Sequence, residues 1–424
     1  MRFVLSSYGT RGEVEPCVAI GRELLRRGHE VCMAVPSDLV GFVESAGLAA
    51  VAYKLDTQAV TGAYVNLWKH FYFSPNLWRM RELRRLRGEL GKIGLQCFWE
   101  TSTTLMSLAE GADLLLTGVN FEQPAANVAE YHDIPLATMH FSPTRANGQI
   151  VPILPAPVIR SAMRVRESLV WRLAKSLEDA QRRELGLSKT TAPYPHRMAE
   201  RGSLEIQAYD EVCFPGLAAE WVKWDGQRPF VGTLTLEAPT DADDEVASWI
   251  AAGTPPIYFG FGSMLVESPA DTLAMIGAAC AQLGERALVC AAGSDFSDVP
   301  HFDHVKVVGA VNFAAIFPSC RALVHHGGSS TTPIGLRAGA PQLILWTIRD
   351  QAILGAAVKR LQVGTARRFS STTRESLVAD LRTILAPQYL TRTREIATRM
   401  TKPAEGVTAA ADLVEGFARL RRVG

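Results

Sequence analysis

The chain has 424 residues, more than one hydrophobic core usually organises, so two domains of about 200 residues each are expected. Its composition, 47% hydrophobic and 21% charged with a formal charge of +1, is typical of a globular protein and provides no global attraction for nucleic acid or anionic lipid. The seven cysteines are scattered and never spaced as C-x-x-C, which argues against a disulfide framework and a zinc site.

The first half of the chain alternates apolar strands with helical patterns. A strand is expected at residues 2–6, followed by a polar loop and a helix that begins near Pro16 and ends near Gly28. Continuous apolar runs typical of buried parallel strands follow at 30–36, 112–118 and 135–141. This alternation indicates an α/β domain built on a parallel sheet.

The second half repeats this pattern after a segment at 223–246 that is rich in Pro, Gly and Asp and typical of a linker. Strand-like runs restart at 256–262, 287–293, 305–309, 322–328 and 342–346. We therefore expect a second doubly wound domain, whose ligands would bind at the carboxyl ends of its strands.

No stretch reaches the roughly 18 apolar residues of a membrane span, and the first apolar run is too short for a signal peptide. We therefore expect a cytoplasmic protein, in which any membrane contact is peripheral and at the inner face.

Small, polar residues follow three strands of the second half. The first stretch is "GFGSM" at 260–264, and the second is Gly309 after Val308. The third and richest in glycine, serine and threonine is "HHGGSSTT" at 325–332. Backbone N–H groups, hydroxyls and a helix N-terminus in such a cluster favour an anion, especially a phosphate. In this interpretation His325 and His326 donate to phosphate oxygens. The alternative is structural: Ser329 and Thr331 cap the helix and the two glycines form the turn.

Two familiar phosphate motifs are excluded. The chain has no G-x-x-x-x-G-K-[ST], and Leu265 occupies the position where a dinucleotide fingerprint needs its third glycine. A nucleotide kinase and a nicotinamide enzyme are therefore disfavoured.

Taken together, five motifs in order make the chain resemble GT-B glycosyltransferases of glycosyltransferase family 1, particularly bacterial antibiotic and glycolipid glycosyltransferases. The motifs are "GTRGEVEP" at 9–16, "FGFGSM" at 259–264, "HHGGSSTT" at 325–332, "LRAGAPQL" at 336–343 and "RDQ" at 349–351. The resemblance implies two Rossmann-like domains facing each other across a cleft, inversion at the anomeric carbon, and no metal or cofactor besides the nucleotide-sugar substrate.

The resemblance also implies a division of labour along the chain. Residues 1–225 would bind the acceptor, 226–240 would link the domains, 241–400 would bind the nucleotide sugar, and 401–424 would form a helix crossing back to the first domain. By position, diphosphate binding falls to His325, His326, Gly327, Gly328, Ser329, Ser330 and Thr331. Gly262 and Ser263 would face the phosphates, Val311 would border the base, and Asp350 and Gln351 would bind sugar hydroxyls. The alternative for Asp350 is a helix N-cap.

One departure from the family concerns the nucleotide. Plant members have a glutamate that holds the ribose hydroxyls where this chain has Pro333, and proline cannot accept a hydrogen bond from a 2′-hydroxyl. We therefore expect a dTDP sugar to be preferred over a UDP sugar.

The expected general base is Glu13, which stands where antibiotic-type members carry aspartate. A carboxylate at the carboxyl end of the first strand can take the proton of an attacking hydroxyl. Arg11 is a candidate electrostatic partner. The alternative is that Glu13 or Glu15 only stabilises the start of the helix.

The acceptor is expected to be a hydrophobic lipid, lipopeptide or natural product. Residues 64–108 carry aromatic side chains followed by a basic amphipathic helix, a combination that suits a lipid-like acceptor or peripheral contact with an anionic membrane. The alternative is an ordinary helix with its leucines packed inward. His140 is a candidate neighbour of the acceptor, with a buried core histidine as the alternative.

Two other functions stay open: a nucleotide-sugar epimerase or hydrolase, and a non-catalytic helper of the same fold.

Overall fold

The computed structural model describes residues 1–54, 56, 80–150, 154–236, 239–262, 268–291 and 302–423, with the side chains of 80–84, 86, 87, 349 and 421–423 left aside. The chain divides into two compact units. Unit 1 comprises Met1–Glu211, Gly216–Leu236 and Thr401–Gly424, and unit 2 comprises Val212–Pro215 and Glu237–Met400.

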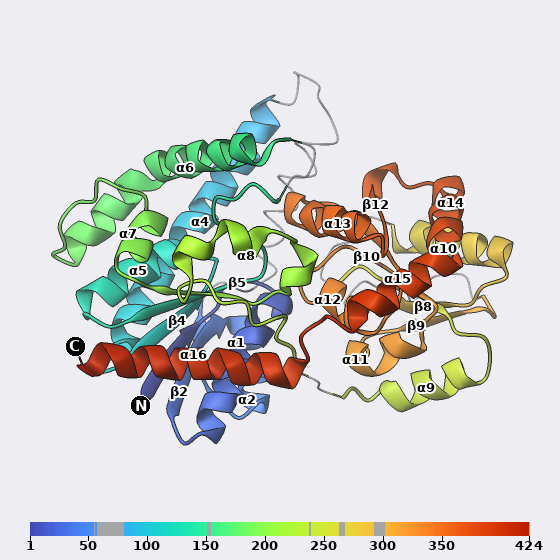
Figure 1. Ribbon diagram of the computed structural model, residues 1–424, viewed down its shortest axis with the longest axis horizontal. Coiled ribbons are helices and arrows are strands. Elements are labelled where there is room, and N and C mark those ends of the chain that lie inside the picture. Colours follow the sequence, from blue (N-terminus) through green and yellow to red (C-terminus); the bar gives the residue numbers. More distant parts are fainter. Residues whose placement is uncertain are drawn as a thin grey trace. The chain divides into compact units, whose positions relative to one another are not determined.

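Unit 1 is built on a six-stranded parallel sheet with the strand order β3-β2-β1-β4-β5-β6 (Figure 1). Its strands are β1 (Arg2–Ser6), β2 (Glu30–Pro36), β3 (Ala49–Tyr53), β4 (Leu114–Gly118), β5 (Leu136–His140) and β6 (Leu204–Gln207). β4 and β5 are buried along their whole length, which explains their uninterrupted apolar sequence. Part of the segment expected to link the two domains belongs to this unit. Phe230 forms a parallel bridge with Gln207 at the edge of β6.

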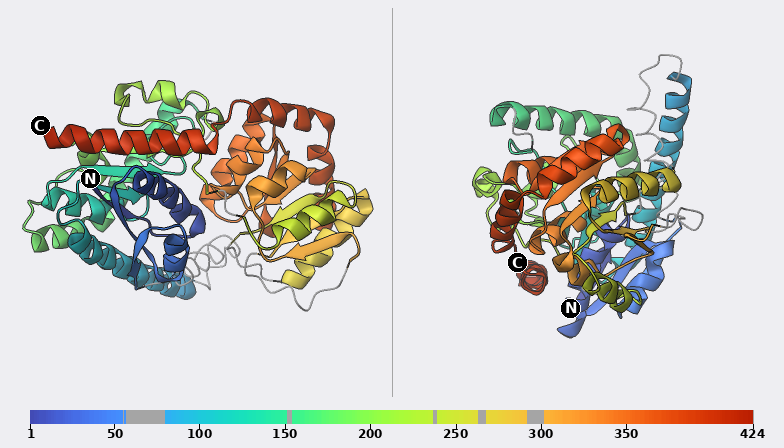
Figure 2. Two further views of the ribbon diagram at one scale, coloured as in Figure 1. Left: turned by 90° about the horizontal axis from the view of Figure 1, so that it is seen from below. Right: turned by 90° about the vertical axis from the view of Figure 1, so that its right-hand side faces the viewer.

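Helices cover both faces of this sheet. They are α1 (Arg11–Arg26), α2 (Val40–Ser45), α4 (Met80–Leu108), α5 (Glu122–Tyr131), α6 (Ala156–Glu184), α7 (Tyr194–Glu200), α8 (Leu217–Glu220) and α16 (Pro403–Val423). Helix α16, the long red helix in Figure 2, packs against α1, and Arg27 at the end of α1 forms ion pairs with Asp412 and Glu415 of α16. The C-terminal helix is thus part of unit 1.

The start of α1 differs from the sequence expectation. The helix begins at Arg11 rather than near Pro16, because Thr10 and Glu13 form a capping box that fixes the first turn. Pro16 then lies inside the helix, where it provides no backbone N–H.

Unit 2 has a second six-stranded parallel sheet, with the order β12-β11-β10-β7-β8-β9. Its strands are β7 (Ile257–Gly260), β8 (Ala287–Cys290), β9 (Val305–Val308), β10 (Ala322–His325), β11 (Gln342–Trp346) and β12 (Gly364–Arg368). Its helices are α9 (Asp243–Ala251), α10 (Pro269–Leu283), α11 (Phe313–Ile316), α12 (Thr331–Arg337), α13 (Arg349–Leu361), α14 (Arg374–Ile384) and α15 (Pro387–Ala397). The expected α/β class, with two doubly wound parallel sheets, is confirmed.

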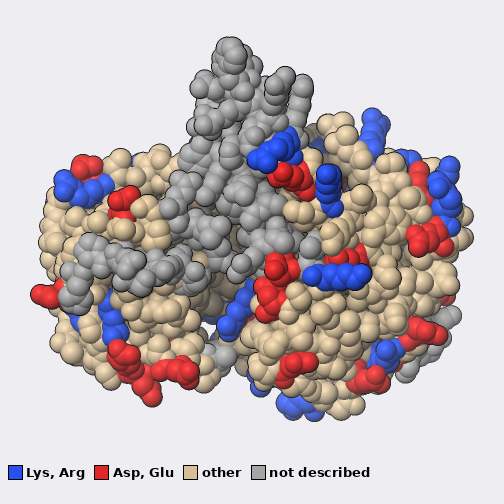
Figure 3. All heavy atoms as spheres, turned by 180° about the vertical axis from the view of Figure 1, so that it is seen from behind, with Lys and Arg blue, Asp and Glu red and all other residues tan. Residues whose placement is uncertain are grey.

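The distribution of charged side chains on the surface agrees with the net charge of +1. Over the described part of the face in Figure 3, basic and acidic side chains are interspersed rather than gathered by sign. Within the described ranges, no helix combines the length and apolar character that crossing a bilayer requires.

Candidate functional site

The centre of the candidate site in unit 2 is the turn that follows β10. His325 closes the strand and is fully buried, with Nε2 donating to Oε1 of Gln342 (2.7 Å) and Nδ1 accepting from the backbone N–H of Gly327 (3.1 Å). Burial lowers the pKa of His325 to about 3, although the bond to Gln342 acts in the opposite direction, so the ring is neutral. Both ring nitrogens are therefore used inside the protein. This corrects the expectation that His325 donates to phosphate: it shapes the turn instead.

The ring of His326 explains why two of the surrounding positions are glycine. A Cβ on Gly262 would lie 2.6 Å from Cε1 of this ring, and a Cβ on Gly328 would lie 2.8 Å from its Nε2. Gly262 also has a φ of +60°, in the left-handed region. Among the described residues Nδ1 of His326 has no hydrogen-bond partner, and burial lowers the pKa of His326 to about 4 despite a bond to the Gly260 backbone. The ring thus joins the loop after β7 to the turn after β10.

The hydroxyl side chains of the cluster lie at the start of α12. Ser329 and Ser330 are partly exposed and Thr331 is nearly buried. The N-cap residue is Ser330, and its side chain makes no capping bond. The sequence offered Ser329 and Thr331 as capping residues, whereas in the structure the N-cap position is Ser330. Thr332 does bond locally, from Oγ1 to the carbonyl of Gly328 (2.9 Å).

The first turn of α13 packs directly on this cluster. A Cβ on Gly327 would lie 3.1 Å from the backbone oxygen of Gln351, and the φ of Gly327 is +86°. Oε1 of Gln351 accepts from the backbone N–H groups of Thr347 (2.8 Å) and Ile348 (3.2 Å), so this side chain caps its own helix. Asp350 is exposed in the first turn, and the N-cap is Ile348 rather than Asp350. The carboxylate is nevertheless stabilised there by the helix N-terminus.

Two other residues that were expected to bind the nucleotide sugar are Val311 and Ser263. Val311 is buried beyond the end of β9, in a cluster with Ile316 and Phe317. Ser263 lies outside the described residues. The structure therefore brings together Gly262, the 325–331 turn and the first turn of α13 at the carboxyl edge of β7, β10 and β11.

In unit 1, Glu13 lies in the first turn of α1 at the carboxyl end of β1. Its Oε2 accepts from the backbone N–H of Thr10 (2.7 Å), and its Oε1 accepts from Nδ2 of Asn120 (2.8 Å). Nδ2 of Asn120 also donates to the carbonyl of Tyr8 (2.8 Å), which ties the loop after β4 to the loop after β1. A Cβ on Gly9 would lie 2.0 Å from Oε2 of Glu13, so only glycine fits beside this carboxylate.

The expected partner of Glu13 is paired elsewhere. Nε of Arg11 lies 3.5 Å from Oε2 of Glu15, and its guanidinium lies over the ring of Phe42. Glu15 also accepts from the backbone N–H of Leu236 (2.9 Å), and burial raises its pKa. Arg11 is therefore paired with Glu15, whereas Asn120 donates to Glu13.

His140 is a buried core histidine. It is fully buried at the end of β5, with Nε2 2.7 Å from Oε1 of Glu122 and Nδ1 3.2 Å from Oγ1 of Thr144. Arg145 forms two further bonds to Glu122 and one to Glu205. Although burial opposes ionisation, Arg145 and His140 lower the pKa of Glu122 to about 2. This network fixes the loop that carries Asn120, two residues before Glu122.

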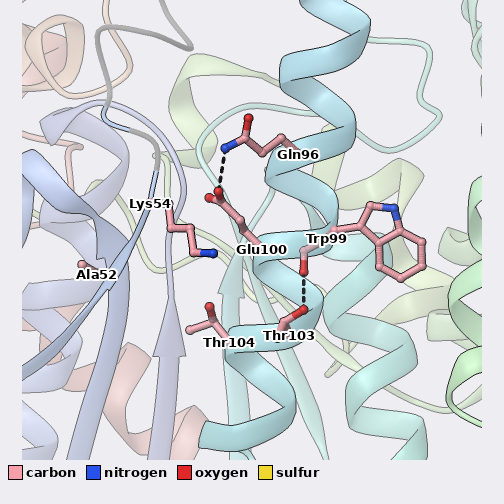
Figure 4. Close-up of a pocket in the computed structure, with 7 residues that line it drawn as sticks. All are labelled: Ala52, Lys54, Gln96, Trp99, Glu100, Thr103 and Thr104. Atoms are coloured by element: carbon pink, nitrogen blue, oxygen red, sulfur yellow. Dashed lines mark hydrogen bonds between the residues drawn. The ribbon is translucent and has the colours of Figure 1, made fainter.

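A cavity of about 350 Å³ lies between β3 and α4. It is lined by Ala52, Lys54, Gln96, Trp99, Glu100, Thr103 and Thr104. Figure 4 shows Lys54, Glu100 and Thr104 facing one another while the indole of Trp99 points away. These side chains bring charged and polar groups to a cavity whose lining surface is mostly apolar. The aromatic side chains expected at 68–78 lie outside the described residues, whereas the helix expected after them is α4.

Comparison with known proteins decides the family. A family model described as erythromycin biosynthesis protein CIII-like, C-terminal domain, matches residues 260–414, and the glycosyltransferase family 28 N-terminal domain matches residues 3–90. An uncharacterized glycosyltransferase of Mycobacterium tuberculosis (strain H37Rv) is 60% identical over 425 residues and covers 100% of both chains. This chain belongs to the glycosyltransferases.

More distant relatives differ in what their names say of their acceptors. A sterol 3-beta-glucosyltransferase of Arabidopsis thaliana is 26% identical to this glycosyltransferase over 97% of its chain and 67% of the relative. Among solved structures, the calicheamicin glycosyltransferase CalG4 superposes with a TM-score of 0.70 at 17% identity over 98% of each chain. The glycosyltransferase VinC, solved with dTDP, superposes with a TM-score of 0.66 at 18% identity over 100% of each chain. The fold of this glycosyltransferase is therefore GT-B, as expected from the sequence.

Two residues of the site were missed in the sequence. Gln342 is a lone polar residue at the start of the apolar run of β11, and such a residue signals a buried hydrogen bond. It links His325 to α12, because its Nε2 donates to the carbonyl of Thr332 (2.9 Å). Asn120 follows β4 at the same sheet edge as Glu13, and only the strand order places these two residues together.

Proposed function

We propose that this glycosyltransferase moves a hexose or deoxyhexose from a nucleoside diphosphate sugar to a hydroxyl of a hydrophobic lipid, lipopeptide or natural-product acceptor. The reaction would invert the anomeric carbon, need no metal, and prefer dTDP over UDP sugars. The observation that carries the proposal is the glycine-framed turn after β10 with the first turn of α13 packed on it.

This turn suits a diphosphate because it combines little side-chain bulk with several donors. Gly327 and Gly328 allow close approach of the backbone, while Ser329 and Ser330 remain partly exposed. Each hydrogen bond to a charged phosphate contributes about 1.5–3 kcal/mol, so a few of them suffice for a diphosphate. Asp350 is an exposed carboxylate beside the turn and is proposed to accept from sugar hydroxyls.

The nucleotide preference rests on Pro333, which lies buried in the first turn of α12 and cannot accept from a ribose 2′-hydroxyl. VinC, a structural neighbour, was solved with dTDP. Product inhibition tests the preference: dTDP should inhibit transfer at lower concentration than UDP. Equal or reversed potency would refute it.

Glu13 is the proposed general base. The acceptor oxygen would attack the anomeric carbon as the bond from that carbon to the diphosphate oxygen breaks, and the hydroxyl proton would pass to the Glu13 carboxylate. This single displacement produces inversion. The bonds from Thr10 and Asn120 hold the carboxylate in place.

The acceptor class rests on the amphipathic character expected for 64–108 and on the name of the plant relative, a sterol glucosyltransferase. Peripheral membrane contact through this range is also proposed, although only its α4 part is among the described residues. A mass-spectrometric screen of dTDP and UDP sugars against lipid aglycones tests substrate class. Formation of free sugar alone, with no glycoside, would instead indicate a hydrolase.

A pair of variants tests the base. Glu13→Gln keeps a side chain that can occupy the same place but cannot take a proton, and we expect kcat to fall by at least a hundredfold. Glu15→Gln, two residues away in the same helix, is the matched control and should retain most activity. Transfer by Glu13→Gln at the wild-type rate, with donor binding intact, would remove Glu13 from the mechanism.

A further inference from the structure

Helix α6, labelled in Figure 1, belongs to unit 1 and carries a row of exposed aliphatic side chains. Val158, Val165, Leu169 and Leu173 are 54%, 59%, 53% and 85% exposed. Their spacing of seven, four and four residues places them on one face of the helix, and we call this row the α6 stripe. Other positions of the helix, including Ile159 and Met163, are buried, so the helix has apolar side chains both in the core and in solvent.

The α6 stripe is unusual for this protein. Of the twelve exposed large hydrophobic residues among the described side chains, six lie between Leu154 and Leu173. Single exposed aliphatic residues need no explanation, but a contiguous row on one helix indicates a surface that a partner covers.

The charges around the α6 stripe have one sign. Arg164, Arg166 and Arg172 are exposed, and helical geometry places Arg166 and Arg172 on either side of the row. The one acidic residue from 154 to 177 is Glu167, and it is partly buried. Burial raises the pKa of Glu167, while Arg145 and His196 act against that rise from the core side.

We propose that the α6 stripe is a docking surface for an anionic lipid bilayer. In this arrangement α6 lies in the plane of the interface, with its aliphatic row among the acyl chains and its arginines at the lipid phosphates. Residues 158–173 span about 22 Å along the helix axis, so the contact is a line of side chains parallel to the membrane. This surface is distinct from residues 64–108 and does not depend on the proposed donor, acceptor or base.

Charge decides between a bilayer and a second copy of the chain. A two-fold dimer would place the α6 stripe against itself, and the exposed arginines of one copy would then face those of the other without an exposed acid on this part of α6 to pair with them. A surface of anionic phosphates matches the same arginines directly.

Vesicle flotation tests the proposal. The full chain is mixed with vesicles of phosphatidylcholine alone or of equal parts phosphatidylcholine and phosphatidylglycerol, at about 0.1 M salt. We expect wild-type protein to float with the anionic vesicles and to bind the neutral ones at least about tenfold more weakly. Leu169→Gln with Leu173→Gln should weaken binding to anionic vesicles by about tenfold or more, and Arg166→Gln with Arg172→Gln should remove most of the difference between the two vesicle types.

Val222→Gln is the matched control, because Val222 is 70% exposed in unit 1 but lies outside α6; it should bind as wild type does. Thermal unfolding should be unchanged in all these variants, since each side chain is exposed. The proposal is overturned if wild-type protein does not bind anionic vesicles, or if the double leucine variant binds them equally well. It is also overturned if sedimentation shows a wild-type dimer that this variant dissociates while vesicle binding is absent, which would assign the surface to a second copy.

Discussion

Replacing Gln342 by methionine should uncouple the turn after β10 from the strand beside it. Gln342 is fully buried at the first position of β11, where it accepts from Nε2 of His325 and donates to the carbonyl of Thr332. Methionine has a similar volume but provides neither bond, so one donor and one acceptor would remain buried without a partner. Each such group costs about 1–3 kcal/mol, and the expected loss is about 2–6 kcal/mol in the free energy of unfolding of unit 2.

The same substitution should weaken donor binding, because His325 orients Gly327 through its other nitrogen. Calorimetric titration with dTDP should show affinity falling by about tenfold, which corresponds to about 1.4 kcal/mol. Gln207→Met is the matched control: Gln207 is equally buried on a strand of unit 1, where its Nε2 donates to the carbonyl of Glu205. The control should lose stability without losing dTDP affinity. If Gln342→Met loses stability but binds dTDP as wild type does, Gln342 does not position the turn.

Three further predictions concern the glycine frame, acid stability and the carboxylate environment. Gly262→Ala should lower dTDP affinity more than tenfold because its Cβ meets an imidazole carbon at 2.6 Å, whereas Gly284→Ala, at a φ of +67° with nothing within 4 Å, should cost only backbone strain and leave titrations with dTDP unchanged. Because burial lowers the pKa of His325 to about 3, the unfolded chain binds a proton that the folded chain does not; stability should therefore fall as pH drops from about 6.5 toward 3, by up to about 5 kcal/mol, and urea unfolding of His325→Gln should lack this part of the loss. Asn120→Asp should lower kcat/KM at neutral pH by about tenfold or more in initial-rate assays, because a second carboxylate 2.8 Å away opposes the ionised form of Glu13; an unchanged rate would show that Asn120 does not support the base.

Short-range patterns in the sequence were sufficient for nine of the twelve described strands and for the glycine- and hydroxyl-rich turn after β10, whereas β3, β6 and β12 were not predicted. The uninterrupted apolar runs of β4, β5 and β10 predict buried parallel strands because each run must be covered on both faces. The glycines and hydroxyls that follow β10 predict an anion-binding turn because their chemistry is local. These expectations depend on neighbours in the chain, which a sequence displays directly.

Side-chain roles were harder to predict because the partners lie far apart in the chain. His325 has the chemistry of a phosphate donor, yet the parallel pairing of β10 with β11 brings Gln342 to its ring and uses its donor inside the core. Gln351 has a side chain that could bind sugar hydroxyls, yet its Oε1 accepts from backbone N–H groups at the start of α13. Arg11 lies two residues from Glu13 but bonds to Glu15, since residues four apart on a helix share a face.

The sequence by itself determined that this is an α/β chain with two parallel sheets and a glycine- and hydroxyl-rich turn after one strand. Only the tertiary structure decided which polar groups of that turn remain accessible, that Asn120 holds Glu13, and that α6 exposes an aliphatic row. The physical reason is that strand formation follows from patterns within a few residues, whereas burial and hydrogen bonding depend on which distant segments the sheet order places side by side.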